Sequence, residues 1–215
     1  MPLRSRSVTG CRIMTNEKPF HRRSIRLVGA NYSEPGGYFL TICAAGRKQI
    51  FGRIESARTV LSPLGEIVRQ CWMQIPEHFP QASLEEFVVM PNHLHGIIAL
   101  HSRKRNGEAP VGARYIVPSS VEAHTPERFQ KPVRGSIPTI VRTFKAAVTR
   151  AAQKSLGWKG EIWQRNYFER VLRDGKEYAG ASRYILENPM RWKWDKENAK
   201  RETDPKDEKA PQWLK

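Results

Sequence analysis

The sequence predicts an α+β fold in which helices pack on one face of an antiparallel β-sheet. Three observations support this fold class. Runs rich in β-branched and aromatic residues are interspersed with amphipathic segments, a Pro-Asn pair separates two adjacent runs, and no run leads into the Gly-rich turn of a parallel dinucleotide-binding fold. At 215 residues, the chain is long enough for one domain with a buried core.

The first half of the chain predicts three strands and one helix. The run GGYFLTICAAG, bounded by glycines, predicts a buried strand at residues 37–44. A helix is expected between Ser62, the capping residue, and Pro80, because apolar residues recur there at helical steps: Leu64, Ile67, Val68, Cys71 and Ile75. Residues 85–90 and 93–100 are β-rich runs split by Pro91-Asn92, which predicts a tight antiparallel hairpin.

The second half of the chain predicts two more helices and one more strand. Residues 101–135 are rich in Gly, Pro, Ser and charge, which indicates a long exposed loop. Ser136 begins an amphipathic helix, EIWQRNYFERVLR gives a strand, and Asp174 caps a last helix that Pro189 ends. We therefore expect a folded domain at residues 26–192, between a basic flexible arm at 1–25 and a charged, disordered tail at 193–215.

The charge of the chain points to a polyanionic partner. Lys and Arg number 37 against 21 Asp and Glu, which gives a net charge of +16 and a pI near 10.2. The excess lies in residues 1–29 and 136–175, whereas residues 30–100 are nearly neutral. The predicted binding surface therefore flanks the central hairpin, and an ordinary basic surface without such a partner is the alternative.

Composition also excludes several classes of protein. The three cysteines lie far apart and favour neither a disulfide framework nor a cysteine zinc site. No apolar run approaches the ~18 residues of a membrane span, and the N-terminus lacks the apolar region of a signal peptide. We expect a cytoplasmic protein that contacts no membrane and binds no nucleotide cofactor.

The stretch FVVMPNHLHGIIAL contains a candidate metal site. Alternate side chains of a strand share a face, so His93 and His95 point the same way while Leu94 points into the core. Two imidazoles are too few for a closed zinc site, so an open site that shares its cation with a substrate oxygen fits better. Gly96 removes bulk beside them, which would let a phosphate or a partner helix approach. A pair that is only hydrogen-bonded or solvated is the alternative.

Two motifs resemble a known family. FVVMPNHLHGIIAL is similar to the histidine-hydrophobic-histidine signature of HUH nucleases, and IWQRNYFERVLRDGKEYAGASRYILENPMRW is similar to the C-terminal signature of REP-associated tyrosine transposases. These enzymes belong to the single-tyrosine, single-strand transposase superfamily, and the resemblance spans residues 25–192. It implies a ferredoxin-like or RRM-like antiparallel sheet with the histidine pair on a central strand and a C-terminal helix that carries the nucleophile.

The resemblance also implies a reaction. Single-stranded DNA would be cleaved and joined at hairpins of repetitive extragenic palindromes through a 5′-phosphotyrosyl intermediate. The family pattern RYI..NP falls on residues 183–189, which selects Tyr184 as the nucleophile over Tyr167 and Tyr178. Helical geometry agrees, because Tyr178 shares the core-facing side of its helix with Ile185.

The implied cofactor is Mg²⁺ or Mn²⁺, held by His93 and His95. The resemblance places a third ligand one helical turn after the nucleophile, where this chain has Asn188 and wider relatives have a glutamine. His78 and His101 are alternative ligands, although each is better interpreted as a surface residue.

The basic stretches predict contacts to the phosphates of single-stranded or hairpin DNA, from Arg22, Arg23, Arg26, Arg142, Lys145, Arg165 and Arg173. Trp163 and Tyr167 are candidates for stacking on unpaired bases. The protein would act as a monomer or a homodimer. Two other functions stay open: a catalytically idle module that binds hairpin DNA or RNA, and a water-using metal-dependent nuclease in which Tyr184 is dispensable.

Overall fold

A computed structural model describes residues 33–102 and 133–203. Its strands are β1 (Gly36–Cys43), β2 (Gly52–Glu55), β3 (Arg58–Leu61), β4 (Ala82–Val89), β5 (His93–Leu100) and β6 (Phe168–Leu172). Its helices are α1 (Pro63–Met73), α2 (Ile75–His78), α3 (Ile137–Leu156) and α4 (Gly175–Glu187), with short 3₁₀ turns η1 (Ala45–Arg47) and η2 (Trp192–Trp194). No helix in these two ranges is long and apolar enough to cross a membrane.

Four strands form one antiparallel sheet in the order β4-β5-β1-β6, and β2 and β3 form a separate hairpin. Helix α1 lies between β1 and β4 in sequence, and α3 lies between β5 and β6, which is the chain path of a ferredoxin-like fold. Strand β5 is an inner strand, and Cys43 of β1 pairs with its first residue, His93. The α+β class and the central position of the histidine strand are thus as the sequence predicts.

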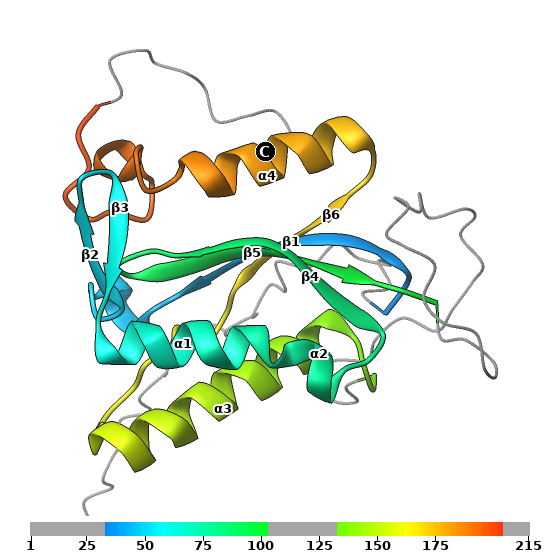
Figure 1. The fold of residues 1–215 in the computed structure, drawn as a ribbon, viewed down its shortest axis with the longest axis horizontal. Helices are drawn as coiled ribbons and strands as arrows, with labels where there is room; N and C mark the ends of the chain where they lie inside the picture. Colours follow the sequence, from blue (N-terminus) through cyan, green and yellow to red (C-terminus); the bar gives the residue numbers. More distant parts are fainter. Residues whose placement is uncertain (1–32, 103–132, 204–215) are drawn as a thin grey trace, which may run out of the picture.

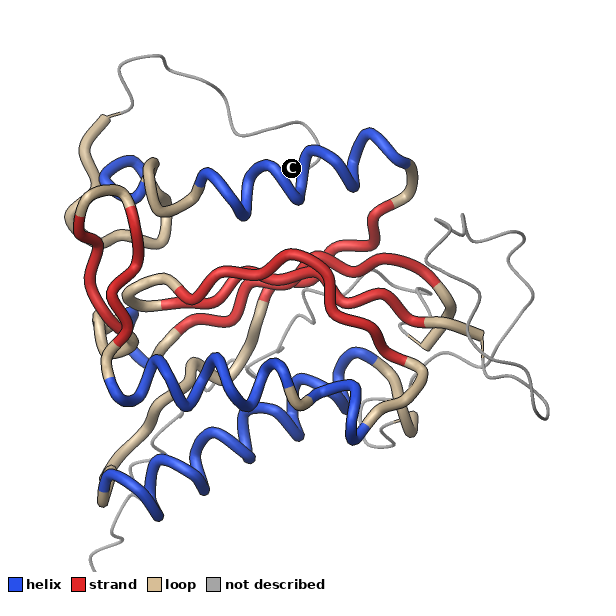
Figure 2. Tube along the Cα trace, viewed as in Figure 1, coloured by secondary structure: helices blue, strands red, loops and turns tan. Residues whose placement is uncertain are grey.

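Helices cover both faces of the sheet. Helices α1 and α3 lie on one side, and α4 lies on the other (Figure 1). Figure 2 shows the four-stranded sheet as a layer between these helices, with the β2–β3 hairpin apart at one end. The expectation that all helices pack on one face was therefore wrong for the last helix. The physical reason is that every residue of β1 is buried, and a strand apolar on both faces needs cover on both faces.

The two faces bury two separate cores. The larger one joins the sheet to α1 and α3 and includes Leu40, Leu94, Trp72 and Phe144. The smaller one joins the sheet to α4 and consists of Phe39, Ile97, Leu172, Ala181 and Ile185. Because side chains alternate along β5, the histidine pair lies on the side of the smaller core, and Leu94 on the side of the larger one, as predicted.

The room left by Gly96 is used by a helix of the same chain. A Cβ atom at Gly96 would lie 2.5 Å from Cζ2 of Trp72 and 3.1 Å from Cβ of Phe87. Trp72 belongs to α1, which packs on the face away from the histidines. The glycine therefore serves helix packing and makes no space for a phosphate.

The predicted starts of α1 and α4 are confirmed. Ser62 Oγ accepts a hydrogen bond from the amide of Gly65 at 3.0 Å, and Asp174 Oδ1 accepts one from the amide of Glu177 at 2.8 Å. The first predicted helix is in fact two, because α1 ends at Met73 and α2 starts beyond Gln74 with a proline in its first turn. The last strand is shorter than predicted and begins at residue 168.

The folded part of the chain continues past residue 192, where the predicted domain ends. Asp195, Glu197 and Asn198 are buried, and the amide of Glu202 donates to the carbonyl of Lys193 at 2.7 Å. Polar contacts and not apolar packing hold this segment in place. Its charged sequence therefore has no apolar pattern from which its order could have been predicted. The predicted arm, including Arg22, Arg23 and Arg26, most of the predicted loop and residues 204–215 lie outside the described residues.

Candidate metal centre

Strand β5 begins with two fully buried histidines on the face toward α4. The ring centroids of His93 and His95 are 4.4 Å apart, and neither side chain is exposed to solvent. Nε2 of each ring is buried and has no hydrogen-bond partner among the described residues. Buried polar atoms are almost always paired, so two such atoms on neighbouring rings indicate a place for a ligand.

Asn92 fixes the protonation of His93. Its amide nitrogen donates to the carbonyls of Glu197 at 2.7 Å and Arg47 at 3.1 Å, both of which can only accept. Its oxygen therefore faces Nδ1 of His93 at 2.8 Å and must receive a proton from it. In the neutral ring this leaves the lone pair on Nε2, the atom that a metal ion would bind.

Thr41 of β1 positions the ring of His95. The threonine hydroxyl lies 2.9 Å from Nδ1, and the ring of Phe39 stacks on the imidazole with centroids 5.3 Å apart. Burial lowers the pKa of His93 to about 3, aided by the charges of Lys196 and Arg47. Burial, with the neighbouring His93, also holds the pKa of His95 well below its usual value. Both rings are thus neutral at pH 7, as metal ligands must be.

Asp195 completes a cluster of three potential ligands. One ligand atom from each of His93, His95 and Asp195 lies within 4.8 Å of the others, and all three residues are buried. The carboxylate accepts from the amide of Glu197 at 2.6 Å and from Nδ2 of Asn188 at 3.0 Å. Sequence reasoning missed Asp195, because it placed the residue within a disordered tail and no spacing linked it to the histidines.

Asn188, the ligand that the family resemblance implies, lies directly beside this cluster. It is buried at the end of α4, and its amide nitrogen faces the Asp195 carboxylate. A carboxylate only accepts, so the orientation of the amide is fixed. Its oxygen Oδ1 is buried without a partner in the part of the chain that the structure describes. The cluster thus offers two imidazole nitrogens and two kinds of oxygen donor.

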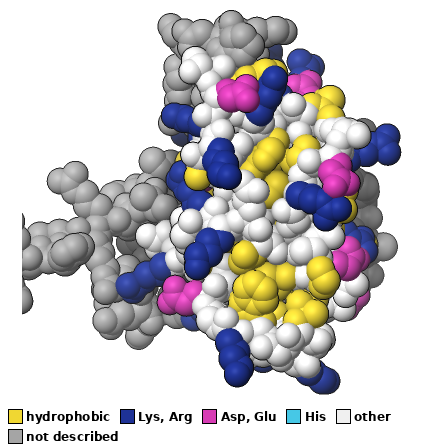
Figure 3. All heavy atoms as spheres, turned by 90° about the vertical axis from the view of Figure 1, so that its left-hand side faces the viewer, with side chains coloured by type: hydrophobic (Ala, Val, Ile, Leu, Met, Phe, Trp, Pro, Cys, Tyr) yellow, Lys and Arg dark blue, Asp and Glu magenta, His cyan; other side chains and the backbone are white. Residues whose placement is uncertain are grey.

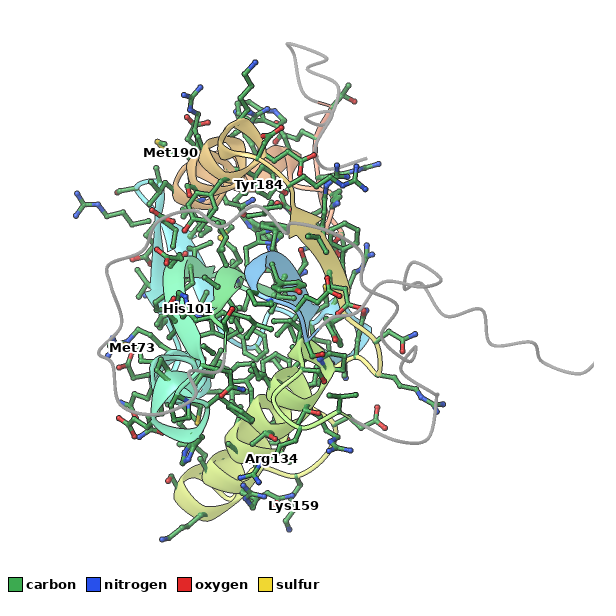
Figure 4. The ribbon with its side chains drawn as sticks, turned by 90° about the vertical axis from the view of Figure 1, so that its right-hand side faces the viewer. Met73, His101, Arg134, Lys159, Tyr184 and Met190 are labelled. Atoms are coloured by element: carbon green, nitrogen blue, oxygen red, sulfur yellow. The ribbon has the colours of Figure 1, made fainter. Side chains whose placement is uncertain are left out.

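Tyr184 is the tyrosine that lies at the histidines. Its ring meets the ring of His95 edge to face with centroids 5.2 Å apart, and its phenol is hydrogen-bonded to the side chain of Asn188. Figure 4 shows Tyr184 beneath α4, where the helix covers the sheet. Burial, followed by the charge of Asp195, raises the pKa of the phenol, whereas the bond from Asn188 lowers it.

Tyr178 lies at the other end of the sheet. Its Cδ2 would lie 3.6 Å from a Cβ placed on Gly37, and Gly37 pairs with Ala99 at the far end of β5. Burial and a hydrogen bond to Glu85 raise the pKa of its phenol. Tyr184 therefore lies near the candidate metal ligands, whereas Tyr178, about 1.7 helical turns earlier in α4, packs at the other end of the sheet.

The ligand chemistry of the cluster fits a divalent cation. Neutral imidazole nitrogens suit Mn²⁺ and later transition ions, and carboxylate and amide oxygens suit Mg²⁺ and Mn²⁺. Three buried atoms of this cluster have no hydrogen-bond partner among the described residues, Nε2 of both histidines and Oδ1 of Asn188, and these are the atoms that such an ion would engage. The alternative ligands are elsewhere, since His78 is exposed at the end of α2 and His101 binds Ser83 Oγ at 2.8 Å beyond β5.

The predicted phosphate contacts that the structure describes are not gathered at this site. Arg142 is exposed on α3, across the sheet from the histidines, and Arg165 and Arg173 are exposed on either side of β6. Lys145 does not point outward as predicted, because its ammonium donates to the carbonyls of Gln164 at 2.8 Å and two following residues. Burial lowers the pKa of Lys145 to about 8.

Other basic residues, which sequence reasoning missed, lie at the cluster. The charges of Arg47 and Lys196 act on His93, and that of Arg191 acts on Tyr184. The turn between β4 and β5 lies against the start of β2, since the amide of Phe51 donates to the carbonyl of Pro91 at 2.9 Å. Lys and Arg side chains are spread over this end of the molecule (Figure 3). The neighbourhood of the cluster can thus attract an anion.

No family model matches the chain. An uncharacterized protein of Haemophilus influenzae is 42% identical over 175 residues, which cover 81% of this chain and 92% of that protein. The chain belongs to the same family as this protein.

Solved structures also resemble the chain. A REP-associated tyrosine transposase bound to a REP hairpin matches with a TM-score of 0.47 and 22% identity, over 78% of this chain and 74% of that one. A Deinococcus radiodurans protein provisionally described as a transposase matches with a TM-score of 0.38 and 16% identity, over 74% and 95%. The first of these structures is described by the name of the family that the sequence motifs resemble.

Proposed function

We propose that the chain is a REP-associated tyrosine transposase that cleaves and joins single-stranded DNA at hairpins. The observation that carries this proposal is the meeting of Tyr184 from α4 with His93 and His95 from β5, in a buried cluster with unpartnered ligand atoms. Tyr184 and the two histidines are about ninety positions apart in the sequence, and the fold brings them together.

The proposed cofactor is a divalent cation, Mg²⁺ or Mn²⁺, with His93 and His95 as nitrogen ligands and Asn188 and Asp195 as candidate oxygen ligands. When bound, it would supply a Lewis acid that offsets the charge of a phosphodiester. The hydrogen bonds that His93 and His95 form with Asn92 and Thr41 would hold the imidazoles in the orientation required for binding.

Tyr184 would be the nucleophile. Its phenolic oxygen would form a bond to phosphorus, the bond from phosphorus to the 3′ oxygen would break, and the phenolic proton would end on the freed 3′ hydroxyl. The products are a 5′-phosphotyrosyl link and a free 3′ end, and the same step in reverse joins the 5′ end to another 3′ hydroxyl. Asn188 supports this role, since its bond to the phenol favours the ionised form against the effect of burial.

The site needs only one copy of the chain. Tyr184 and His95 of the same chain are in ring contact, so the proposal is cleavage in cis. A monomer is then sufficient, and exchange of tyrosines between two copies is unnecessary for the first step.

Covalent capture separates the proposal from its two alternatives. Labelled single-stranded hairpin DNA is incubated with the protein and Mn²⁺, and the denatured products are resolved on a gel. We expect a covalent protein–DNA adduct that is absent in Tyr184→Phe and strongly reduced in His93→Ala. Tyr178→Phe is the matched control, because it removes a phenol from the same helix and leaves the cluster intact.

Each alternative predicts a different outcome. A water-using nuclease releases free DNA fragments without an adduct, and Tyr184→Phe still cleaves. An idle binding module shifts the DNA on a native gel but yields neither adduct nor fragments. Either outcome with the wild-type chain would overturn the proposed phosphotyrosyl chemistry.

A further inference from the structure

We propose that Phe168 and Lys196 form a binding place for an unpaired nucleobase and its phosphate beside the candidate metal centre. This inference rests on the proposed function and extends it to the substrate nucleotide next to the cleavage point. The ligand is a nucleotide of single-stranded DNA, bound by stacking and charge without readout of its sequence.

The position of Phe168 links it to the histidines. It is the first residue of β6, an edge strand of the sheet, and it pairs with Thr41, the residue that holds His95. Paired residues of antiparallel strands share a face, so Phe168 lies on the face that carries the metal cluster. The ring of Phe39 lies between them, with centroids 6.4 Å from Phe168 and 5.3 Å from His95.

Phe168 is unusually exposed for an aromatic residue of this protein. Its exposed fraction is 38%, and no other aromatic residue is among the large exposed hydrophobic side chains of the described ranges. The residues that the sequence offered for stacking are engaged elsewhere. Trp163 packs against Phe51 and Phe144 in the larger core, with centroids 5.1 and 5.5 Å away, and Tyr167 packs against the same core. Phe168 is thus an exposed aromatic ring near the cluster that is open to a base.

Lys196 supplies the charge at the same place. Its ammonium lies 5.5 Å from the centroid of the Phe168 ring, and the residue directly follows Asp195 of the cluster. The residue is exposed, so the contact with the ring is a weak one that a stacked base replaces. The displaced ammonium can then meet the phosphate of the same nucleotide. Phe168 thus offers an aromatic face for one base, and Lys196 offers a positive charge for its phosphate. Only the ring of Phe39 separates Phe168 from His95 of the proposed cleavage centre.

The test measures base stacking without cleavage. The probe is a hairpin oligonucleotide whose unpaired flank carries 2-aminopurine at one position at a time, bound to the full chain in EDTA. At one position of the flank we expect fluorescence quenching that is lost in Phe168→Leu, which keeps apolar bulk but has no π-face, and retained in Phe168→Trp. Binding by Phe168→Leu should weaken by about 5-fold or more, from the usual strength of base stacking.

Two matched controls complete the design. Leu156→Ala changes another exposed apolar residue, at the end of α3, and should leave quenching and affinity unchanged. Lys196→Gln should reduce the slope of log affinity against log salt concentration by about one. Lys200→Gln changes an exposed lysine of the same segment and should leave this slope unchanged. Quenching that is unchanged in Phe168→Leu, or affinity within about 2-fold of wild type, would overturn the inference.

Failure of this inference is distinguishable from failure of the proposed function. If the wild type forms the Tyr184 adduct and Phe168→Leu binds like the wild type, only the nucleobase site is wrong. If Phe168 governs quenching but the wild type forms no adduct, the nucleotide binds but the transposase chemistry is wrong. A wild-type chain that does not bind the oligonucleotide overturns both.

Discussion

Asn92 has a structural role that can be measured apart from any activity. Its side chain is almost fully buried and makes three hydrogen bonds, to Nδ1 of His93 and to the carbonyls of Arg47 and Glu197. A hydrogen bond contributes about 1 kcal/mol net, and a buried group left unpaired costs about 1–3 kcal/mol. Asn92→Ala should therefore lower the free energy of unfolding by about 3 kcal/mol.

The same substitution should weaken cation binding. Without Asn92, nothing fixes the proton of His93 on Nδ1, and loss of such a partner typically lowers metal affinity about 10- to 100-fold. Urea unfolding measures the stability, and calorimetric titration with Mn²⁺ measures the affinity. Asn92→Asp separates the two effects. It can still accept from His93 but cannot donate to the two carbonyls, so it should lose stability and retain most of the affinity for Mn²⁺.

The control for Asn92→Ala is Ser83→Ala, which removes the hydrogen bond to His101 at the other end of the hairpin. It should cost about 1 kcal/mol or less and leave Mn²⁺ affinity unchanged. A loss of stability below about 1 kcal/mol in Asn92→Ala, or an unchanged affinity for Mn²⁺, would refute the reasoning about this asparagine.

Three further predictions follow from other parts of the molecule. Gly96→Ala places a Cβ 2.5 Å from Trp72, so its urea midpoint should fall by an amount equivalent to about 1–3 kcal/mol. Asp174→Ala removes the cap of α4 and should cost about 1 kcal/mol in the same assay, with Asp174→Asn nearly neutral. Burial lowers the pKa of Lys145 to about 8 from 10.5, so the unfolded chain binds more protons between these values. Stability should therefore rise with pH across that window, relative to Lys145→Met, and an equal pH dependence in the two proteins would contradict the assignment.

Local signals in the sequence predicted the elements that position the site. The Pro91-Asn92 turn and the alternation along residues 93–100 placed His93 and His95 on one face, and the Asp174 cap with Pro189 bounded the helix of Tyr184. These features depend on neighbouring residues alone. The side of the sheet that α4 covers was mispredicted, although the uninterrupted apolar run of β1 carries the relevant information, since such a run indicates cover on both faces.

Contacts between distant residues could not be predicted. Asp195 reaches the cluster because the chain turns back after α4 through hydrogen bonds between polar groups, and a charged stretch has no apolar periodicity to reveal this. The helical period places Lys145 on the outer side of its helix. Residues 164–166 pass over this position, and the ammonium of Lys145 donates hydrogen bonds to their carbonyls. Both outcomes are set by tertiary structure.

The central claim concerns the atom that attacks the phosphodiester, and mass spectrometry of the trapped adduct tests it most directly. The protein is incubated with single-stranded hairpin DNA and Mn²⁺, digested with nuclease and trypsin, and searched for a tyrosine that carries a nucleotide. The account predicts the modification on Tyr184, within the tryptic peptide of residues 184–191. A nucleotide on Tyr178 or Tyr167, or cleaved DNA with no modified tyrosine, would contradict it.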